Sequence, residues 1–171
     1  MGTSVVKFVA ASGDAAWGIL DDGAIYPLRH HYPHHGTLLE HFFNDRADFD
    51  ATRDPQAISG EVTFLPPISQ PTQLFAQGLN YGDHREESGL DEAADDNLIF
   101  AKPASTITGP NDNIVKPQHV ELLDYEIELG LVLKRAISTQ INVTDATLSD
   151  YVGALVLCND VSARDDMFGA P

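Results

Sequence analysis

The chain has 171 residues, of which 43% are hydrophobic and 21% charged, as is usual for a soluble globular protein of one domain or one domain with an appendage. Its formal charge of −16 at pH 7 repels phosphate backbones and anionic membranes, so we expect neither nucleic acid nor a membrane as partner. No apolar run approaches the roughly 18 residues that span a bilayer. The single Cys158 excludes an intramolecular disulfide, and without a signal-peptide pattern the cytoplasm is the expected compartment.

The first 28 residues predict a small β-meander. Short apolar stretches alternate there with turn-forming residues, and Asp21-Asp22-Gly23-Ala24 is typical of a tight turn between two strands. The strands are expected at residues 5–9, 16–20 and 25–26.

A helix and a linker are expected next. Residues 37–47 carry leucine and phenylalanine at helical spacing behind Thr37, which we predict to be the N-cap. Residues 62–70 contain two prolines and precede Pro71, a composition that predicts an extended linker. We therefore expect a small N-terminal β-rich domain over residues 1–70.

Residues 71–171 predict a larger unit, so that the whole chain is mainly β or α+β. The run Val152–Cys158 is apolar and predicts a buried strand, with Cys158 as an inert core thiol. Such a strand needs neighbours on both sides and few residues follow it, so we expect the sequence to be truncated at its C-terminus. Residues 74–79 begin this unit, and further strands are expected at residues 98–101 and 123–133. A helix is expected at 83–92, and a capped helix or a turn at 143–151.

Acidic residues on the expected strand 123–133 indicate a cation site. Side chains alternate between the two faces of a strand, so Asp124, Glu126 and Glu128 share one face. Glu126 and Glu128 lie about 6.6 Å apart along the strand, and a hard divalent cation between their carboxylates would relieve their repulsion. The alternative is a solvent-facing strand with acidic decoration. The opposite face is expected to be the core face and carries Tyr125, Ile127, Leu129 and Leu131.

Asp160 and Arg164 follow directly on the expected strand 152–158. A carboxylate at a strand end can supply a third metal ligand, and a neighbouring arginine can bind an anion. A ligand set made only of oxygens favours Mg²⁺, with Mn²⁺ or Ca²⁺ as alternatives, and disfavours zinc.

His84 and Glu87 are three residues apart and would be neighbours on a helical turn. A carboxylate held against one imidazole nitrogen raises the basicity of the other, as general-base activation of water requires. A surface salt bridge is the alternative. The histidine-rich segment at residues 29–36 is interpreted as an exposed loop without a catalytic part.

Four segments, taken together and in this order, resemble the fumarylacetoacetate hydrolase family. They are GLNYGDHREE (78–87), FAKPASTITGP (100–110), LDYEIELGLVL (123–133) and DYVGALVLCNDVSARD (150–165). The resemblance implies the family's mixed β-sandwich roll behind a small N-terminal β-rich domain, and a homodimer. The sequence departs from the family at Met167, where a glutamine is common. A thioether cannot donate a hydrogen bond, so an oxyanion contact made by the glutamine would be missing or replaced.

The resemblance also implies a role for each matching side chain. Lys102 would lie near the substrate and act in both binding and catalysis, although on its own it is interpreted as a surface lysine. The other implied roles are metal binding by Glu126, Glu128 and Asp160, a catalytic dyad of His84 and Glu87, and substrate binding by Tyr81 and Arg164.

The activity implied is divalent-metal-dependent hydrolysis of a carbon–carbon bond in a small anionic β-diketo acid, such as an acylpyruvate or a fumarylacetoacetate-like compound. The same site also suits an isomerase, tautomerase or decarboxylase of 2-oxo or 2-hydroxydienoic dicarboxylic acids in aromatic catabolism. A metal-binding module without catalytic activity is the third interpretation.

Overall fold

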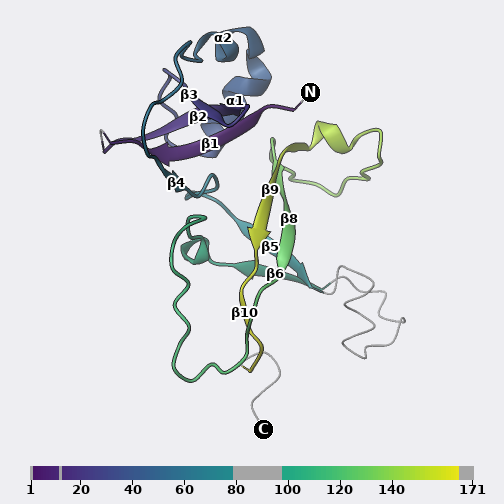
Figure 1. Cartoon of the computed structure of the whole chain (residues 1–171). Helices are drawn as coiled ribbons and strands as arrows, with labels where there is room; N and C mark the ends of the chain where they lie inside the picture. The colour runs from purple at the N-terminus through teal and green to yellow at the C-terminus, as the bar shows by residue number, and fades with distance from the viewer. Residues whose placement is uncertain (1, 12, 79–97, 166–171) are drawn as a thin grey trace. The chain divides into compact units, whose positions relative to one another are not determined.

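The computed structural model describes residues 2–11, 13–78 and 98–165, and these residues are mainly β (Figure 1). They fall into two compact units, Met1–His35 with Asp50–Asn111, and Gly36–Phe49 with Asp112–Pro171. The domain boundary predicted at residue 70 stays a prediction. None of the helices within the described ranges combines the length and the apolar character needed to cross a bilayer.

A four-stranded antiparallel sheet forms the N-terminal part of the first unit. Its order is β3-β2-β1-β4, and it confirms the predicted meander. Asp22 and Gly23 have positive φ angles of 47° and 77°, as a tight two-residue hairpin turn requires. The strands are β1 (Ser4–Val9), β2 (Ala15–Asp21), β3 (Ala24–Pro27) and β4 (Thr63–Leu65).

The fourth strand corrects the expectation of a plain linker over residues 62–70. Thr63–Leu65 pairs with the free edge of β1, where Phe64 lies opposite Phe8. Phe8 is 1% exposed, so the sheet gains a strand beside its most buried side chain. The Trp17 indole is also buried and donates a hydrogen bond to the Tyr32 carbonyl at 3.0 Å.

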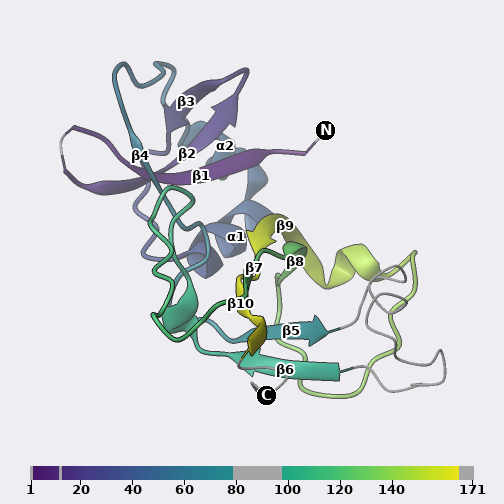
Figure 2. The ribbon, with the colours of Figure 1, turned by 60° about the horizontal axis from the view of Figure 1, so that its bottom comes forward.

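Two further strands belong to the first unit. β5 (Leu74–Gly78) and β6 (Leu98–Lys102) form an antiparallel pair, drawn as neighbouring arrows in Figure 2. β6 confirms the strand predicted at residues 98–101, whereas β5 was not predicted as a strand. Lys102 ends β6 opposite Leu74 and is followed by the 3-10 helix Ala104–Thr106.

The helical segment comprises α1 (His35–Asn44) and α2 (Arg46–Ala51). α1 begins two residues before Thr37, which therefore lies in the first turn and is not the N-cap. The apolar spacing fixes the buried face of a helix but not its first residue, which explains the difference. Phe49 of α2 is fully buried and packs edge-on to Phe42 of α1, with ring centroids 5.1 Å apart.

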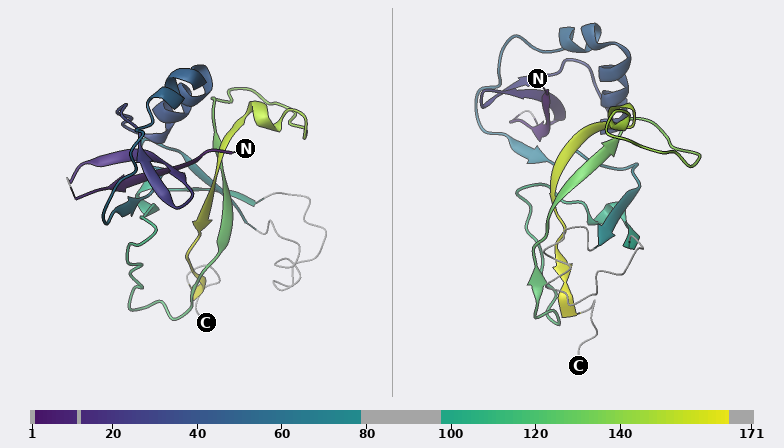
Figure 3. Two further views of the ribbon diagram at one scale, coloured as in Figure 1. Left: turned by 45° about the horizontal axis from the view of Figure 1, so that its top comes forward. Right: turned by 90° about the vertical axis from the view of Figure 1, so that its right-hand side faces the viewer.

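The second unit contains a long hairpin of β8 (Ile127–Leu133) and β9 (Val152–Asn159), shown in green and yellow in Figures 1 and 3. β7 (Leu123–Asp124) and β10 (Ser162–Ala163) form a short second pair. The strand predicted over 123–133 is therefore interrupted at residues 125–126. The segment predicted as a helix or turn at 143–151 contains the 3-10 helix Leu148–Asp150.

The apolar face of this hairpin is exposed, whereas the alternation predicted that it would be the core face. Its four predicted core residues in 125–131 are between 50% and 73% exposed. Leu155 and Leu157 on β9 are 62% and 79% exposed, and Cys158, expected in the core, is exposed as well. Among the described strands β9 pairs only with β8, so it does not have the neighbours on both sides that the apolar run at residues 152–158 predicted.

Candidate functional site

One antiparallel register connects the two strand pairs of the second unit. Ile127 pairs with Asn159, and Asp124 pairs with Ser162, so the residues between them place Glu126 opposite Asp160. No residue is inserted on either strand, and the alternation of faces is therefore kept. Glu126 and Asp160 consequently start on the same face of the ladder.

Glu128 and Arg164 extend this face in opposite directions. Glu128 lies in β8 opposite Cys158, one alternation beyond Glu126. Arg164 is fixed by its backbone N–H, which donates to the Leu122 carbonyl at 2.9 Å. Even-numbered residues 124, 126 and 128 are partly buried, whereas the odd-numbered residues between them are exposed. The acidic face is therefore the more sheltered face of the hairpin.

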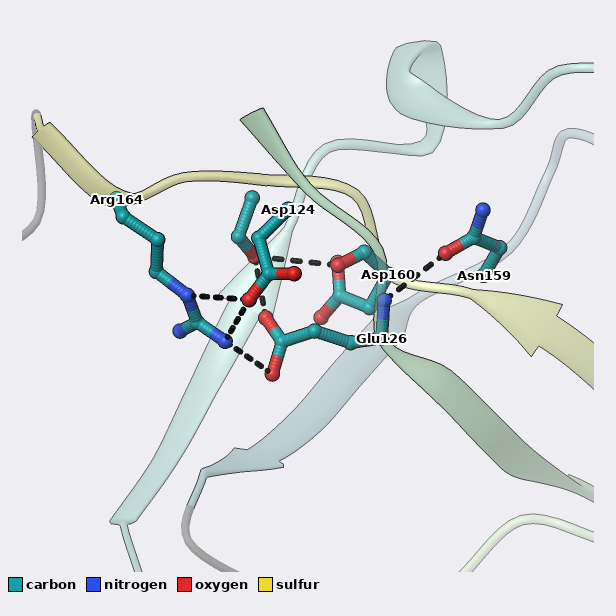
Figure 4. Close-up of polar contacts among 6 residues, drawn as sticks. Asp124, Glu126, Asn159, Asp160 and Arg164 are labelled. Carbon is teal, nitrogen blue, oxygen red and sulfur yellow. Dashed lines mark hydrogen bonds and ion pairs between the residues drawn. The ribbon is translucent and has the colours of Figure 1, made fainter. Parts of the chain in front are cut away.

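The ladder is interrupted where the two acidic residues face each other. The Asp160 N–H donates to the Glu126 carbonyl at 2.7 Å, but the Glu126 N–H donates to the side chain of Asn159, at 3.0 Å from Oδ1 (Figure 4). The Asp160 carbonyl is reached by the Ser162 hydroxyl at 3.1 Å. Two side chains thus replace one main-chain bond, which explains why the strand stops and restarts here.

Arg164 lies between two carboxylates. Its Nε and Nη2 each lie 2.9 Å from Asp124 Oδ2, and Nη2 lies 3.1 Å from Glu126 Oε2 (Figure 4). Burial disfavours the charged guanidinium, but the hydrogen bonds to Asp124 and the charge of Glu126 outweigh it, so the pKa of Arg164 is raised. Because the side chains of Arg164 and Glu126 are 18% and 20% exposed, this pair is partly shielded from solvent.

Asp165 anchors the end of this segment. Its Oδ2 accepts hydrogen bonds from the backbone N–H groups of Leu122, at 2.9 Å, and of Glu121. These donors hold the pKa of the Asp165 carboxyl below its usual value. Two hydrogen bonds therefore join the segment that carries Arg164 to the residues that directly precede the acidic strand.

The predicted metal ligands fit a hard cation in their chemistry. Glu126, Glu128 and Asp160 offer only oxygen donors, from opposite and alternate positions of one ladder face. In this structure Glu126 contacts Arg164 and Ser162, and within the described ranges no three acidic, histidine or cysteine side chains gather closely enough to hold a metal ion. The three-carboxylate site stays a prediction.

The other predicted site residues are placed only in part. Lys102 ends β6 in the first unit, where its Nζ lies 5.8 Å from the centroid of the Phe100 ring. Its predicted role near the substrate stays a prediction. Tyr81, His84 and Glu87 lie outside the described residues, as does Met167.

Three polar residues of this network were given no role in the site from the sequence. Asp124 holds Arg164, Asn159 takes the Glu126 N–H, and the Ser162 hydroxyl lies 2.6 Å from Glu126 Oε1. The alternation of the strand had already placed Asp124 on the acidic face. Ser162 lies two residues after Asp160, so the same alternation could have indicated it as well. Asn159 breaks that alternation, and no pattern in the sequence predicts its contact.

Comparisons with known proteins agree with the resemblance that the four segments indicated. Residues 73–170 match the family model described as fumarylacetoacetate (FAA) hydrolase C-terminal. The structure superposes with a TM-score of 0.75 on the fumarylacetoacetate hydrolase from psychrophilic Exiguobacterium antarcticum, at 26% identity, covering 98% of this chain and 58% of that one.

Two curated relatives each match more than two thirds of the chain. A mitochondrial oxaloacetate tautomerase of Bos taurus is 38% identical over 119 residues, which are 70% of this chain and 37% of the relative. The bifunctional isomerase/decarboxylase of 4-hydroxyphenylacetate degradation from Escherichia coli is 36% identical over 121 residues, 68% of this chain and 27% of that protein. The chain thus spans well under half the length of either relative. Since the family model matches more than half of its residues, the chain belongs to the fumarylacetoacetate hydrolase family, as its four segments predicted.

Proposed function

We propose that this protein is a divalent-metal-dependent enzyme that interconverts the enol and keto forms of a small 2-oxo dicarboxylic acid such as oxaloacetate. The resemblance alone placed hydrolysis of a carbon–carbon bond first. The names of the relatives at 36–38% identity, a tautomerase and an isomerase/decarboxylase, support the isomerising alternative better.

One structural observation carries the proposal. The antiparallel register puts Glu126 opposite Asp160 and directs Arg164 along the same face, so carboxylates and one cationic side chain meet in a small area. With a divalent cation bound to the carboxylates, such an area suits an anionic substrate with a polarisable carbonyl, because the cation and Arg164 together can hold its charge.

Each residue then has a distinct part. Glu126, Glu128 and Asp160 would hold Mg²⁺, or Mn²⁺ or Ca²⁺ in its place, and the bound cation supplies Lewis acidity towards a 2-oxo acid. The Arg164 guanidinium binds a substrate carboxylate, for which its planar donors are suited. By the family resemblance, His84 oriented by Glu87 moves the proton between oxygen and carbon, and Tyr81 and Lys102 contact the substrate.

The test is a comparison of two reactions on the purified protein with Mg²⁺. Enol–keto exchange of oxaloacetate is followed by the loss of enol absorbance, and acetylpyruvate cleavage by the release of pyruvate. We expect exchange to be catalysed and to fall at least about 100-fold in Glu126→Gln, since even second-shell changes at metal sites cost roughly 10–100-fold. Glu121→Gln makes the same chemical change at an exposed glutamate of the same unit and serves as the control.

The outcomes separate the three interpretations. Cleavage of acetylpyruvate without exchange would show a hydrolase and contradict the proposal. Cation binding without turnover of either substrate would favour the inactive module. The predicted homodimer is tested separately by light scattering of the same preparation.

A further inference from the structure

The Ser162 hydroxyl contacts two of the predicted metal-binding residues, Glu126 and Asp160. Its Oγ lies 2.6 Å from Glu126 Oε1 and 3.1 Å from the backbone carbonyl of Asp160. A serine hydroxyl has one hydrogen to donate, and both of these partners are acceptors. The shorter distance and the charge of the carboxylate place that hydrogen on Glu126, at the length usual for a hydroxyl bound to a carboxylate.

The interruption of the ladder creates this arrangement. Because the Glu126 N–H turns to Asn159, the Asp160 carbonyl is left to face a side chain from two residues further on. Ser162 is held at that place by its pairing with Asp124 in the β7–β10 ladder. The position of the hydroxyl is therefore set by backbone pairing and does not depend on a flexible loop.

The two donors to the Glu126 carboxylate differ in charge. Arg164 binds Oε2 through a guanidinium, and a positive charge there opposes a cation on the same carboxylate. Ser162 binds Oε1 through a neutral hydroxyl, which adds no such repulsion. The hydroxyl contact is thus the one that is compatible with a cation on Glu126.

We propose that Ser162 is a positioning residue, whose hydroxyl fixes the Glu126 carboxylate in the orientation in which it binds a divalent cation. This inference rests on the metal site of the proposed function. It goes beyond that site by naming the group that orients one of its ligands. A serine with a purely local role would only complete the hydrogen bonding of the Asp160 carbonyl, and its loss would change stability without changing cation affinity.

The experiment measures Mn²⁺ and Mg²⁺ binding to the purified protein by isothermal titration calorimetry. Three variants are compared with the unaltered protein: Ser162→Ala removes the hydroxyl, Ser162→Thr keeps it, and Ser138→Ala makes the same deletion at an exposed serine of the same unit. Thermal unfolding of each protein without added cation reports stability independently.

We expect Ser162→Ala to bind the cation about 10–100-fold more weakly, as is usual when the group that orients a ligand is lost. The cation affinities of Ser162→Thr and Ser138→Ala should stay within about threefold of that of the unaltered protein, a small fraction of the loss expected for Ser162→Ala. Unchanged affinity in Ser162→Ala would overturn the proposal and leave the metal site intact. Equal loss in Ser162→Thr, or failure of Ser162→Ala to fold, would also overturn it, because the role would then be one of packing or stability. Absence of binding to the unaltered protein would remove the metal site of the proposed function as well.

Discussion

Replacing Arg164 with methionine should strengthen the binding of a divalent cation. The guanidinium makes two contacts to Asp124 and one to Glu126, the latter at 3.1 Å from Oε2. A cation on Glu126 must displace that one contact, or bind beside a like charge. Methionine keeps an unbranched side chain of similar reach but carries no charge, so the competition for the carboxylate is removed.

The magnitude follows from the number of contacts displaced. A hydrogen bond to a charged group contributes about 1.5–3 kcal/mol, and a single partly shielded contact belongs at the lower end. Since about 1.4 kcal/mol corresponds to a factor of ten, Arg164→Met should raise the affinity for Mg²⁺ about tenfold. Without a cation, the same variant should be less stable, because Asp124 and Glu126 lose their shared positive partner.

Calorimetric titration with Mg²⁺ is the assay, and Arg135→Met is the control. Arg135 carries the same charge but stacks on the Tyr151 ring, 4.2 Å from its centroid. Its loss should change the affinity little, because solvent and salt screen charges that are not in contact. Weaker or unchanged binding in Arg164→Met would refute the reasoning that this guanidinium competes with the cation.

Three further predictions concern the scaffold. Phe49→Ala should lower the free energy of unfolding by about 3–5 kcal/mol in urea titrations, because the ring is fully buried; a loss below about 1 kcal/mol would mean that the site collapses around the cavity. Gly18→Ala should cost about 1–3 kcal/mol in the same titrations, since the new Cβ would lie 2.8 Å from Ile25 Cγ2; an unchanged midpoint would show that the sheet adjusts without strain. The pKa of His35 is lowered from 6.5, first by burial and then by the charges of His34 and Lys7, so the unfolded chain binds the extra proton before the folded protein does. Stability should therefore fall as the pH drops below 6.5 towards the lowered pKa. His35→Gln should flatten this dependence in unfolding curves measured from about pH 8 to about pH 5.

The elements predicted from local pattern were largely found, with differences at their ends. The turn at Asp22-Gly23 and the first three strands follow from alternation and turn chemistry, which are local properties. The strand Thr63–Leu65 was missed because neighbouring prolines indicated a linker, whereas the edge of β1 offered unpaired backbone groups. That edge belongs to a distant part of the chain, so the local sequence of residues 62–70 does not indicate the pairing.

The acidic face was predictable in its residues but not in its contacts. Alternation alone placed Asp124, Glu126 and Glu128 on one side of a strand. The pairing of Asp124 with Ser162, and the resulting alignment of Glu126 with Asp160, depend on a register between segments more than thirty residues apart in sequence. The contact of Arg164 with two carboxylates follows from that register, and only the three-dimensional structure provides it.

The central claim is that three carboxylates bind one hard cation, and crystals grown with Mn²⁺ test it most directly. An anomalous difference map should show one strong Mn²⁺ peak with oxygens of Glu126, Glu128 and Asp160 within about 2.0–2.6 Å, the range for hard divalent cations. A map with no peak there, or with the peak on other side chains while these three stay apart, would contradict the account.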